Sequence, residues 1–317
     1  MTKLISSKFA LFIAFFVGYI SLSQEIVWMR IVSYANKGRS DSFAYALGFL
    51  LVGIGLGAIL SRTLKVKWKI DSLPFIAYLI AISSVFFIFS IPICGWLSTF
   101  AGPIGRTSIY ISIAIVSCLA GGVFPLICEL SIKSSDKVGS RLSWIYFANI
   151  VGATIGPLIT GFILLDVLSL HRIISLLSTA GIIMACIFYS MSFNKSRRGL
   201  VISAGVIIAG AFVFGAPYLY SNLYEKIHHR AAFDANEPYK YLIENKSGVI
   251  AVERLNDALY GGGAYDGNFN LDPVLNTNDI IAAYHVANIH PKPSRVLVIG
   301  LGSGSWTAVV ASHEAVK

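Results

Sequence analysis

Three glycines at alternating positions follow a short apolar run near the C-terminal end of the sequence. The segment reads RVLVIGLGSGSWTAVV, and its glycines are Gly300, Gly302 and Gly304. A continuous apolar run is typical of a strand buried on both faces of a parallel sheet, so we predict a strand over Arg295–Ile299. Glycines let the backbone approach a ligand, and a helix beginning at Ser305 would offer it free N–H groups. The spacing predicts a nucleoside-binding α/β fold; the alternative is a tight turn that binds nothing.

The glycine spacing excludes two common nucleotide sites. A dinucleotide fingerprint needs a third glycine three residues after the second, where this chain has Ser305, or Thr307 if the count begins one glycine later. A P-loop needs a Gly-Lys-Ser/Thr sequence, which does not follow here. We therefore interpret the glycine loop as a site for a nucleoside cofactor that is bound by neither of these two motifs.

The composition is that of a membrane protein. Of the 317 residues, 56% are hydrophobic and 13% are charged, with a mean hydropathy of +0.71, whereas a soluble domain usually has about 25% charged residues. The net charge is +9, but the basic residues lie in short segments between apolar runs, so a lipid bilayer and not nucleic acid is the expected partner. The four cysteines lie inside apolar runs without a C-x-x-C pair, and we expect no disulfide frame and no metal site.

Seven apolar runs are long enough to cross a bilayer, which takes about 20 residues. They are Phe9–Ile31, Phe43–Leu60, Leu73–Leu97, Thr107–Leu130, Leu142–Leu165, Leu170–Phe193 and Leu200–Tyr218. In the fifth run Gly152 and Gly156 form a G-x-x-x-G pair, which predicts close helix packing rather than a ligand site. Pro92, Pro125 and Pro157 are expected to kink their helices.

Basic residues are most frequent in the loops after the second, fourth and sixth runs. These loops carry Arg62, Lys65, Lys67, Lys69, Lys133, Lys137, Arg141, Lys195, Arg197 and Arg198. The positive-inside rule then predicts that these loops and the N-terminus face the cytoplasm, with the protein in the cell (inner) membrane. Seven runs would place the segment after Tyr218 outside, whereas a nucleoside cofactor is expected in the cytosol. The side of the C-terminal region therefore stays open.

Polar residues become frequent from about Ser221. Two β-prone runs, Tyr239–Glu244 and Val249–Leu255, flank a turn and predict a hairpin. The glycines of LYGGGAYDGNF indicate a further strand pair.

The segment NTNDIIAAYHVANIHP predicts a helix that Thr277, Asn278 or Asp279 would cap. We therefore predict a mainly α membrane protein in three regions. These are a multi-pass helical domain over 1–220, a small β-rich region over 221–276, and the first β-α unit of a methyltransferase-like Rossmann fold over 277–317.

The order of these motifs resembles the polyamine aminopropyltransferases, the spermidine synthase family. In that family a small β-domain precedes a methyltransferase-like fold, and a Tyr-His or Tyr-Gln pair and a His-Pro-x-Pro stretch precede the strand and glycine loop. The matching positions here are Tyr284, His285, His290, Pro291, Lys292 and Pro293. The apolar runs resemble the membrane-embedded branch, whose first span carries a Glu followed by Trp and Arg, here Glu25, Trp28 and Arg30. The resemblance covers nearly the whole chain.

The resemblance implies transfer of an aminopropyl group from decarboxylated S-adenosylmethionine to a diamine such as putrescine. It implies that the cofactor contacts Gly300, Gly302, Ser303, Gly304 and His285, and that the polyamine substrate contacts Tyr284, Tyr265 and Asp266. Three alternatives stay open: a packing role for Tyr284, a hydrogen-bonded surface position for His285, and turn chemistry for the other two. The family's ribose-binding acid and general base would lie beyond Lys317, so we expect a truncated synthase that is inactive by itself.

One position departs from the family. Ser303 stands where soluble members usually have an Asp, and a hydroxyl cannot form a charge-assisted bond to the donor's amine. Two alternatives therefore remain: an S-adenosylmethionine-dependent methyltransferase, or a non-catalytic transporter-like or scaffold membrane module. A homo-oligomer is left open.

Two further groups of polar residues lie near or inside the apolar runs. Glu25 lies well inside the first run, and we expect an ion pair with Arg30 rather than a functional carboxylate. The pair His228-His229 follows the last run without nearby carboxylates, which favours an interfacial role over metal binding.

Overall fold

The structure is a computed structural model that describes residues 6–100, 102–131, 138–192, 195–290 and 292–317. The chain divides into two compact units. The first is Met1–Phe233 with Glu244–Lys246, and the second is Asp234–Ile243 with Ser247–Lys317.

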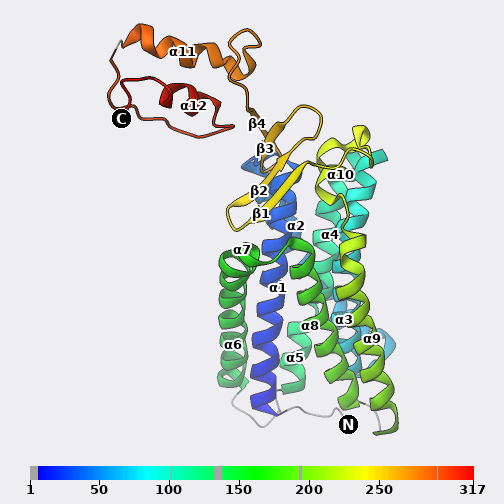
Figure 1. Ribbon diagram of the computed structural model, residues 1–317. Coiled ribbons are helices and arrows are strands. Elements are labelled where there is room, and N and C mark those ends of the chain that lie inside the picture. The colour runs from blue at the N-terminus through cyan, green and yellow to red at the C-terminus, as the bar shows by residue number, and fades with distance from the viewer. Residues whose placement is uncertain (1–5, 101, 132–137, 193–194, 291) are drawn as a thin grey trace. The chain divides into compact units, whose positions relative to one another are not determined.

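Long helices build the first unit (Figure 1). They are α1 (Ser7–Ala35), α2 (Asp41–Trp68), α3 (Ser72–Phe100), α4 (Pro103–Gly121), α5 (Val123–Ser131), α6 (Val138–Ile159), the π-helical turn η1 (Thr160–Leu164), α7 (Leu165–Val167), α8 (Leu170–Ser192), α9 (Lys195–Leu219), α10 (Leu223–His229) and the 3-10 turn η2 (Arg230–Ala232). Within the described ranges, seven helical stretches are long and apolar enough to cross a membrane, with α4–α5 and α6–α7 each forming one stretch. The predicted multi-pass helical region is confirmed.

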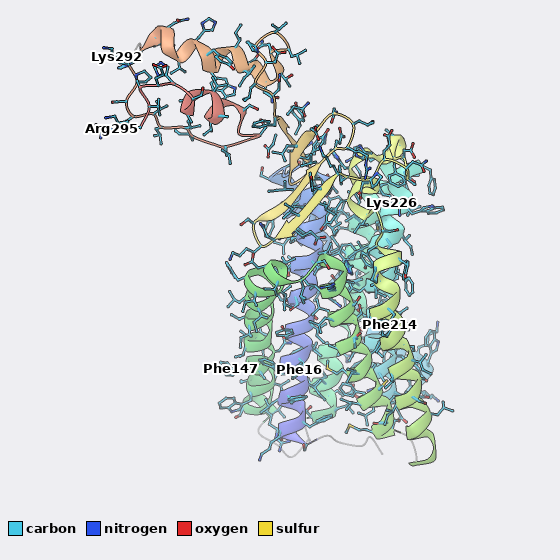
Figure 2. All side chains as sticks on the ribbon, viewed as in Figure 1. Phe16, Phe147, Phe214, Lys226, Lys292 and Arg295 are labelled. Carbon is cyan, nitrogen blue, oxygen red and sulfur yellow. The ribbon has the colours of Figure 1, made fainter. Side chains whose placement is uncertain are left out.

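The outer surface of the bundle is apolar. Phe147 on α6 is 54% exposed and Phe214 on α9 is 79% exposed, and Figure 2 shows both on the bundle. Exposed apolar side chains on this scale suit contact with lipid and not with water. The orientation in the membrane stays a prediction. Lys133 and Lys137, on which it partly rests, lie outside the described residues, as do the side chains of residues 195–198.

Glycines set the closest contacts between helices. A Cβ at Gly152 would overlap the backbone oxygen of Phe15, and one at Gly156 would overlap that of Tyr19, so α6 lies directly against α1. The predicted packing role of both glycines is confirmed. The same arrangement joins α2 to α4, because a Cβ at Gly57 would overlap the backbone oxygen of Cys118. Small residues allow this approach in lipid, where van der Waals contact drives association.

Helix irregularities lie near Pro125 and Pro157, while α3 runs without a break through Pro92. Pro92 and Pro157 lie inside α3 and α6. The π-helical turn η1 begins three residues after Pro157, whereas the N–H that Pro157 lacks would bond an oxygen one turn before it. The boundary between α4 and α5 lies at Gly121–Gly122, close to the carbonyl that Pro125 cannot hydrogen-bond.

The short segment Glu244–Lys246 is held by helix residues of the first unit. Arg30 donates from Nη2 to the backbone oxygens of Asn245, at 2.7 Å, and Lys246, at 3.2 Å. The Glu244 carboxylate accepts a hydrogen bond of 2.7 Å from the Leu170 N–H. Burial raises the pKa of Glu244, and that N–H and the Arg30 charge oppose the rise.

The predicted ion pair between Glu25 and Arg30 is wrong. Residues five apart on a helix lie on different faces, unlike those three or four apart. Arg30 instead binds the two carbonyls of the 244–246 segment.

A four-stranded antiparallel sheet forms the start of the second unit, in the order β1-β2-β3-β4. The strands are β1 (Tyr241–Asn245), β2 (Gly248–Val252), β3 (Ala258–Gly261) and β4 (Ala264–Asn268). Both predicted strand pairs are confirmed. Gly262 and Gly263 have φ values of 57° and 80°, the left-handed region that a tight turn between β3 and β4 needs.

Helices follow the sheet: the 3-10 turn η3 (Thr277–Asp279), α11 (Ile280–Ile289) and α12 (Ser305–Ala311). Ile280 and Ala283 of α11 pack against Val309 and Val310 of α12 in a small buried cluster. The predicted helix is confirmed, and Asp279, one of the three predicted caps, stands at its N-cap position, but the Asp279 side chain forms no capping hydrogen bond. The Asn276 side chain accepts the hydrogen bond from the Ile281 N–H at 3.0 Å, because the backbone turns through left-handed residues before the helix begins.

The predicted strand Arg295–Ile299 is not formed. Residues 295–299 have no regular structure, and the side chains of Leu297 and Ile299 are 84% and 90% exposed. A parallel strand needs neighbouring strands for its backbone groups and cover on both faces, whereas the four strands of this sheet pair with one another. The Rossmann-like unit is therefore not confirmed.

Candidate functional site

The glycine loop has a backbone that other residues would rarely adopt. Gly300, Gly302 and Gly304 have φ values of 84°, 52° and 82°. The Gly304 N–H donates to the Leu301 oxygen at 2.9 Å and closes the turn. Helix α12 begins at the next residue, Ser305. The glycines are thus required by the turn itself, as the sequence predicted, while the helix that follows is only seven residues long.

The loop packs against strand β4. A Cβ at Gly302 would lie 3.2 Å from the backbone oxygen of Asp266. The Ser305 hydroxyl donates to the Asn268 oxygen at 3.1 Å and accepts from the Asn270 N–H at 3.0 Å. The hydroxyls of Ser303 and Ser305 lie 3.0 Å apart. Two groups of predicted site residues, the loop and Asp266, therefore meet in one place.

Asn278 connects the strand to the helix beside the loop. Its Oδ1 accepts from the Tyr265 hydroxyl at 3.1 Å, and its Nδ2 donates to the Asn268 oxygen at 2.8 Å. Its backbone oxygen accepts from Trp306 Nε1 at 3.0 Å. The sequence predicted Asn278 only as a possible cap of the following helix. The available signal was its residue type, since asparagine tolerates the left-handed φ of 57° found here.

Tyr265 lies next to a second tyrosine on the sheet. Its ring centroid is 5.8 Å from that of Tyr260, whose hydroxyl donates to Glu253 at 3.2 Å. Burial, followed by the Glu253 charge, raises the pKa of Tyr260 to about 12. Tyr260 therefore stays protonated at neutral pH and can act as a hydrogen-bond donor, not as a base.

Tyr284 and His285 form their hydrogen bonds away from the glycine loop. The Tyr284 hydroxyl donates to the Leu271 oxygen at 2.8 Å, and its ring lines a cavity of about 120 Å³ with Val309, Val310 and other residues. His285 is exposed, and its Nδ1 lies 3.0 Å from Asn288 Nδ2 on the same helix. The contacts described above therefore connect the glycine loop to Tyr265 and Asp266 more directly than to Tyr284 and His285. Pro291, in the motif that follows, lies outside the described residues.

The histidine pair lies on α10 in the first unit. The ring centroids of His228 and His229 are 4.8 Å apart, and His228 lies 6.2 Å from the ring of Tyr34. Burial lowers the pKa of His228 to about 4, and the positive charges of His229, Lys37 and Arg230 add to the effect. The part of the chain that the structure describes has no group of three or more His, Cys, Asp or Glu that could hold a metal ion.

Acidification should destabilise the first unit through His228. Because its folded pKa lies below the usual value near 6.5, the unfolded chain binds more protons between about pH 6.5 and 4. The stability is therefore fully present above pH 6.5 and falls as the pH drops toward 4. We expect a loss on the order of 1 kcal/mol by pH 5, after allowance for solvent screening. Thermal unfolding in detergent at pH 7 and pH 5 should show a smaller difference for His228→Asn than for the wild type. Two results would contradict this assignment. The first is an equal difference between pH 7 and pH 5 in His228→Asn and in the wild type. The second is that the exposed control His290→Asn reduces that difference as much as His228→Asn does.

Because comparisons with known proteins gave no match, a function can be assigned only from the sequence and from this geometry. No protein-family model matches the chain, and neither curated proteins nor solved structures gave a match. The resemblance to the spermidine synthase family therefore stays a prediction from the sequence. The glycine loop joined to Tyr265 and Asp266 is the candidate site of the second unit.

Proposed function

We propose that this chain is a membrane-bound polyamine aminopropyltransferase of the spermidine synthase type. Its glycine loop would receive decarboxylated S-adenosylmethionine, and a diamine such as putrescine would be the acceptor. The observation that carries the proposal is the packing of Gly302 against Asp266, which joins the expected cofactor loop to the expected substrate-side strand. The bilayer would be the cell (inner) membrane.

The reaction is a displacement at carbon. A neutral amine nitrogen attacks the carbon beside the sulfonium sulfur, the new C–N bond forms, and the C–S bond breaks with its electron pair left on sulfur. The products are methylthioadenosine and an ammonium ion, which releases a proton. The protein's work is to hold the two reactants in line and to favour the neutral amine.

The residues of the site suit a cationic substrate. Asp266 is exposed on β4 and supplies a carboxylate that would attract an ammonium group. Tyr265 is oriented by its hydrogen bond to Asn278 and supplies an aromatic ring on the opposite face of β4 from that carboxylate. The glycine backbone would leave room for the nucleoside.

A methyltransferase is the second candidate function. Ser303 favours it, because its hydroxyl is neutral and lies 3.0 Å from the Ser305 hydroxyl. Ordinary S-adenosylmethionine carries a carboxylate as well as an amine, and a neutral loop would not repel that carboxylate. The two candidates differ in the donor they bind.

A donor-binding measurement separates these functions. The purified protein in phosphatidylcholine nanodiscs would be titrated with tritiated decarboxylated S-adenosylmethionine and, separately, with tritiated S-adenosylmethionine. The aminopropyltransferase predicts tighter saturable binding of the decarboxylated donor. Tighter binding of the ordinary donor would instead indicate the methyltransferase. Binding of neither would overturn both and leave a membrane module without catalysis.

A further inference from the structure

A cavity of about 280 Å³ lies inside the helical bundle of the first unit. Its walls come from α1, α2, α4, α5 and α6. Glycine contacts hold α6 tightly to α1 and α4 tightly to α2. The cavity lies between these two close pairs, since both contribute to its lining. The lining is mostly apolar, as is usual for a small-molecule site with a few polar groups.

One carboxylate lines this cavity. Glu25 lies ten residues before Ala35, the last residue of α1, which is about 15 Å along the helix. Among the residues that the structure describes, the ion pairs do not include Glu25. Arg30, the nearest cation along the helix, binds two carbonyl oxygens instead. An intramembrane carboxylate is costly unless a cation accompanies it.

An aromatic ring lies on the same face of α1. Trp28 is three residues after Glu25, which places both side chains on one side of the helix, and both line the cavity. Trp28 is 2% exposed to solvent. Tryptophan is the best aromatic partner for a cation, and a carboxylate next to it adds charge attraction. Together they form a recognition pair for an organic cation.

The remaining lining suits an apolar body and not a second charge. Leu50, Ile54, Val116 and Phe124 contribute aliphatic and aromatic surface. Gln24 and Asn149 are the amides of the lining, and the Asn149 side chain already donates to the Ala14 oxygen at 3.0 Å. Ile54 of this lining is 38% exposed, so the cavity is not sealed from its surroundings.

We propose that this cavity binds a lipophilic organic cation, with a single ammonium group at Glu25 and Trp28 and an apolar body among the aliphatic residues. A polyamine fits poorly, because its second ammonium group would meet uncharged side chains and no second carboxylate in the lining. The site is separate from the glycine loop, and the proposal does not depend on the aminopropyltransferase assignment. The membrane helices thus have a ligand of their own.

Equilibrium binding of tritiated phenylbutylammonium tests this site. The full chain would be placed in phosphatidylcholine nanodiscs, and empty nanodiscs would correct for partition into lipid. Saturable binding to the wild type is expected, and Glu25→Gln should weaken it about tenfold or more because the charge partner is lost. Ala120→Leu, which fills the cavity and keeps the carboxylate, should weaken it as well. Glu129→Gln is the matched control, since Glu129 lies outside the cavity and pairs with Lys65; its binding should equal the wild type's.

Competition decides the ligand class. Neutral phenylbutanol should displace the probe poorly, and putrescine should displace it poorly too. The proposal is overturned if the wild type shows no saturable binding, if folded Glu25→Gln binds as tightly as the wild type, or if either competitor displaces the probe as well as unlabelled phenylbutylammonium does. Should Glu25→Gln fail to give folded protein, Ala120→Leu and the competitors still decide, because unchanged binding in Ala120→Leu would place the ligand elsewhere.

Discussion

Replacing Gly152 with alanine is expected to force α6 away from α1 and to destabilise the bundle. The added Cβ would overlap the backbone oxygen of Phe15, and a backbone atom cannot move aside as a flexible side chain can. Overpacking of this kind costs about 1–3 kcal/mol. For a domain of this size that is a fall of roughly 2–12 °C in the midpoint of thermal unfolding, which size-exclusion chromatography after heating in detergent would measure.

Gly139→Ala is the matched control on the same helix. A Cβ at Gly139 would meet nothing within 4 Å. Alanine also favours the helix by up to about 1 kcal/mol, so this variant should be as stable as the wild type or slightly more stable. Equal stability of the two variants would show that the contact between α6 and α1 is not as close as described.

Replacing Gly302 with valine is expected to weaken binding of decarboxylated S-adenosylmethionine by at least about tenfold. The φ of 52° is left-handed, where a residue with a side chain costs about 1–2 kcal/mol and a β-branched one costs more. The new Cβ would also lie 3.2 Å from the Asp266 oxygen, a tight contact that would push the loop away from β4. Titration calorimetry of both proteins would measure the change.

Gly248→Val serves as the control for this substitution. Gly248 lies in β2 of the same unit, outside the left-handed region, and a Cβ there would meet nothing within 4 Å. Valine suits a strand, so donor binding should be unchanged. If Gly302→Val bound the donor with wild-type affinity, the glycine loop would not be part of the donor site.

The membrane spans could be predicted because their signal is local. A helix must bring its own hydrogen bonds into the bilayer, so an apolar run of sufficient length predicts it without knowledge of its neighbours. The packing role of Gly152 and Gly156 could be predicted for a similar reason, since their spacing places both on one face. Which helix they would contact was not predictable, because α1 lies more than a hundred residues away in the sequence.

In the second unit, features that depend on residues distant in the sequence could not be predicted from local patterns. The turn at Gly300–Gly304 depends on backbone angles that only glycine readily adopts, and it formed as predicted. The strand Arg295–Ile299 depended on partner strands, and it did not form. Likewise, the role of Asn278 rests on hydrogen bonds to Tyr265 and Asn268, which no spacing pattern predicts. The contact of Arg30 with Asn245 spans 215 residues of sequence. It was therefore not predictable from local spacing, which had suggested a pair with Glu25 instead.

Hydrogen–deuterium exchange tests most directly the central claim that the glycine loop and strand β4 form one site, with the donor on the loop and the substrate-side residues on the strand. The protein in nanodiscs would be compared with and without decarboxylated S-adenosylmethionine. We expect slower exchange on donor binding in two segments, Gly300–Gly304 and Tyr265–Asp266, because the nucleoside would order the loop against the strand. Protection confined to other segments, or an exchange pattern unchanged at saturating donor, would contradict it.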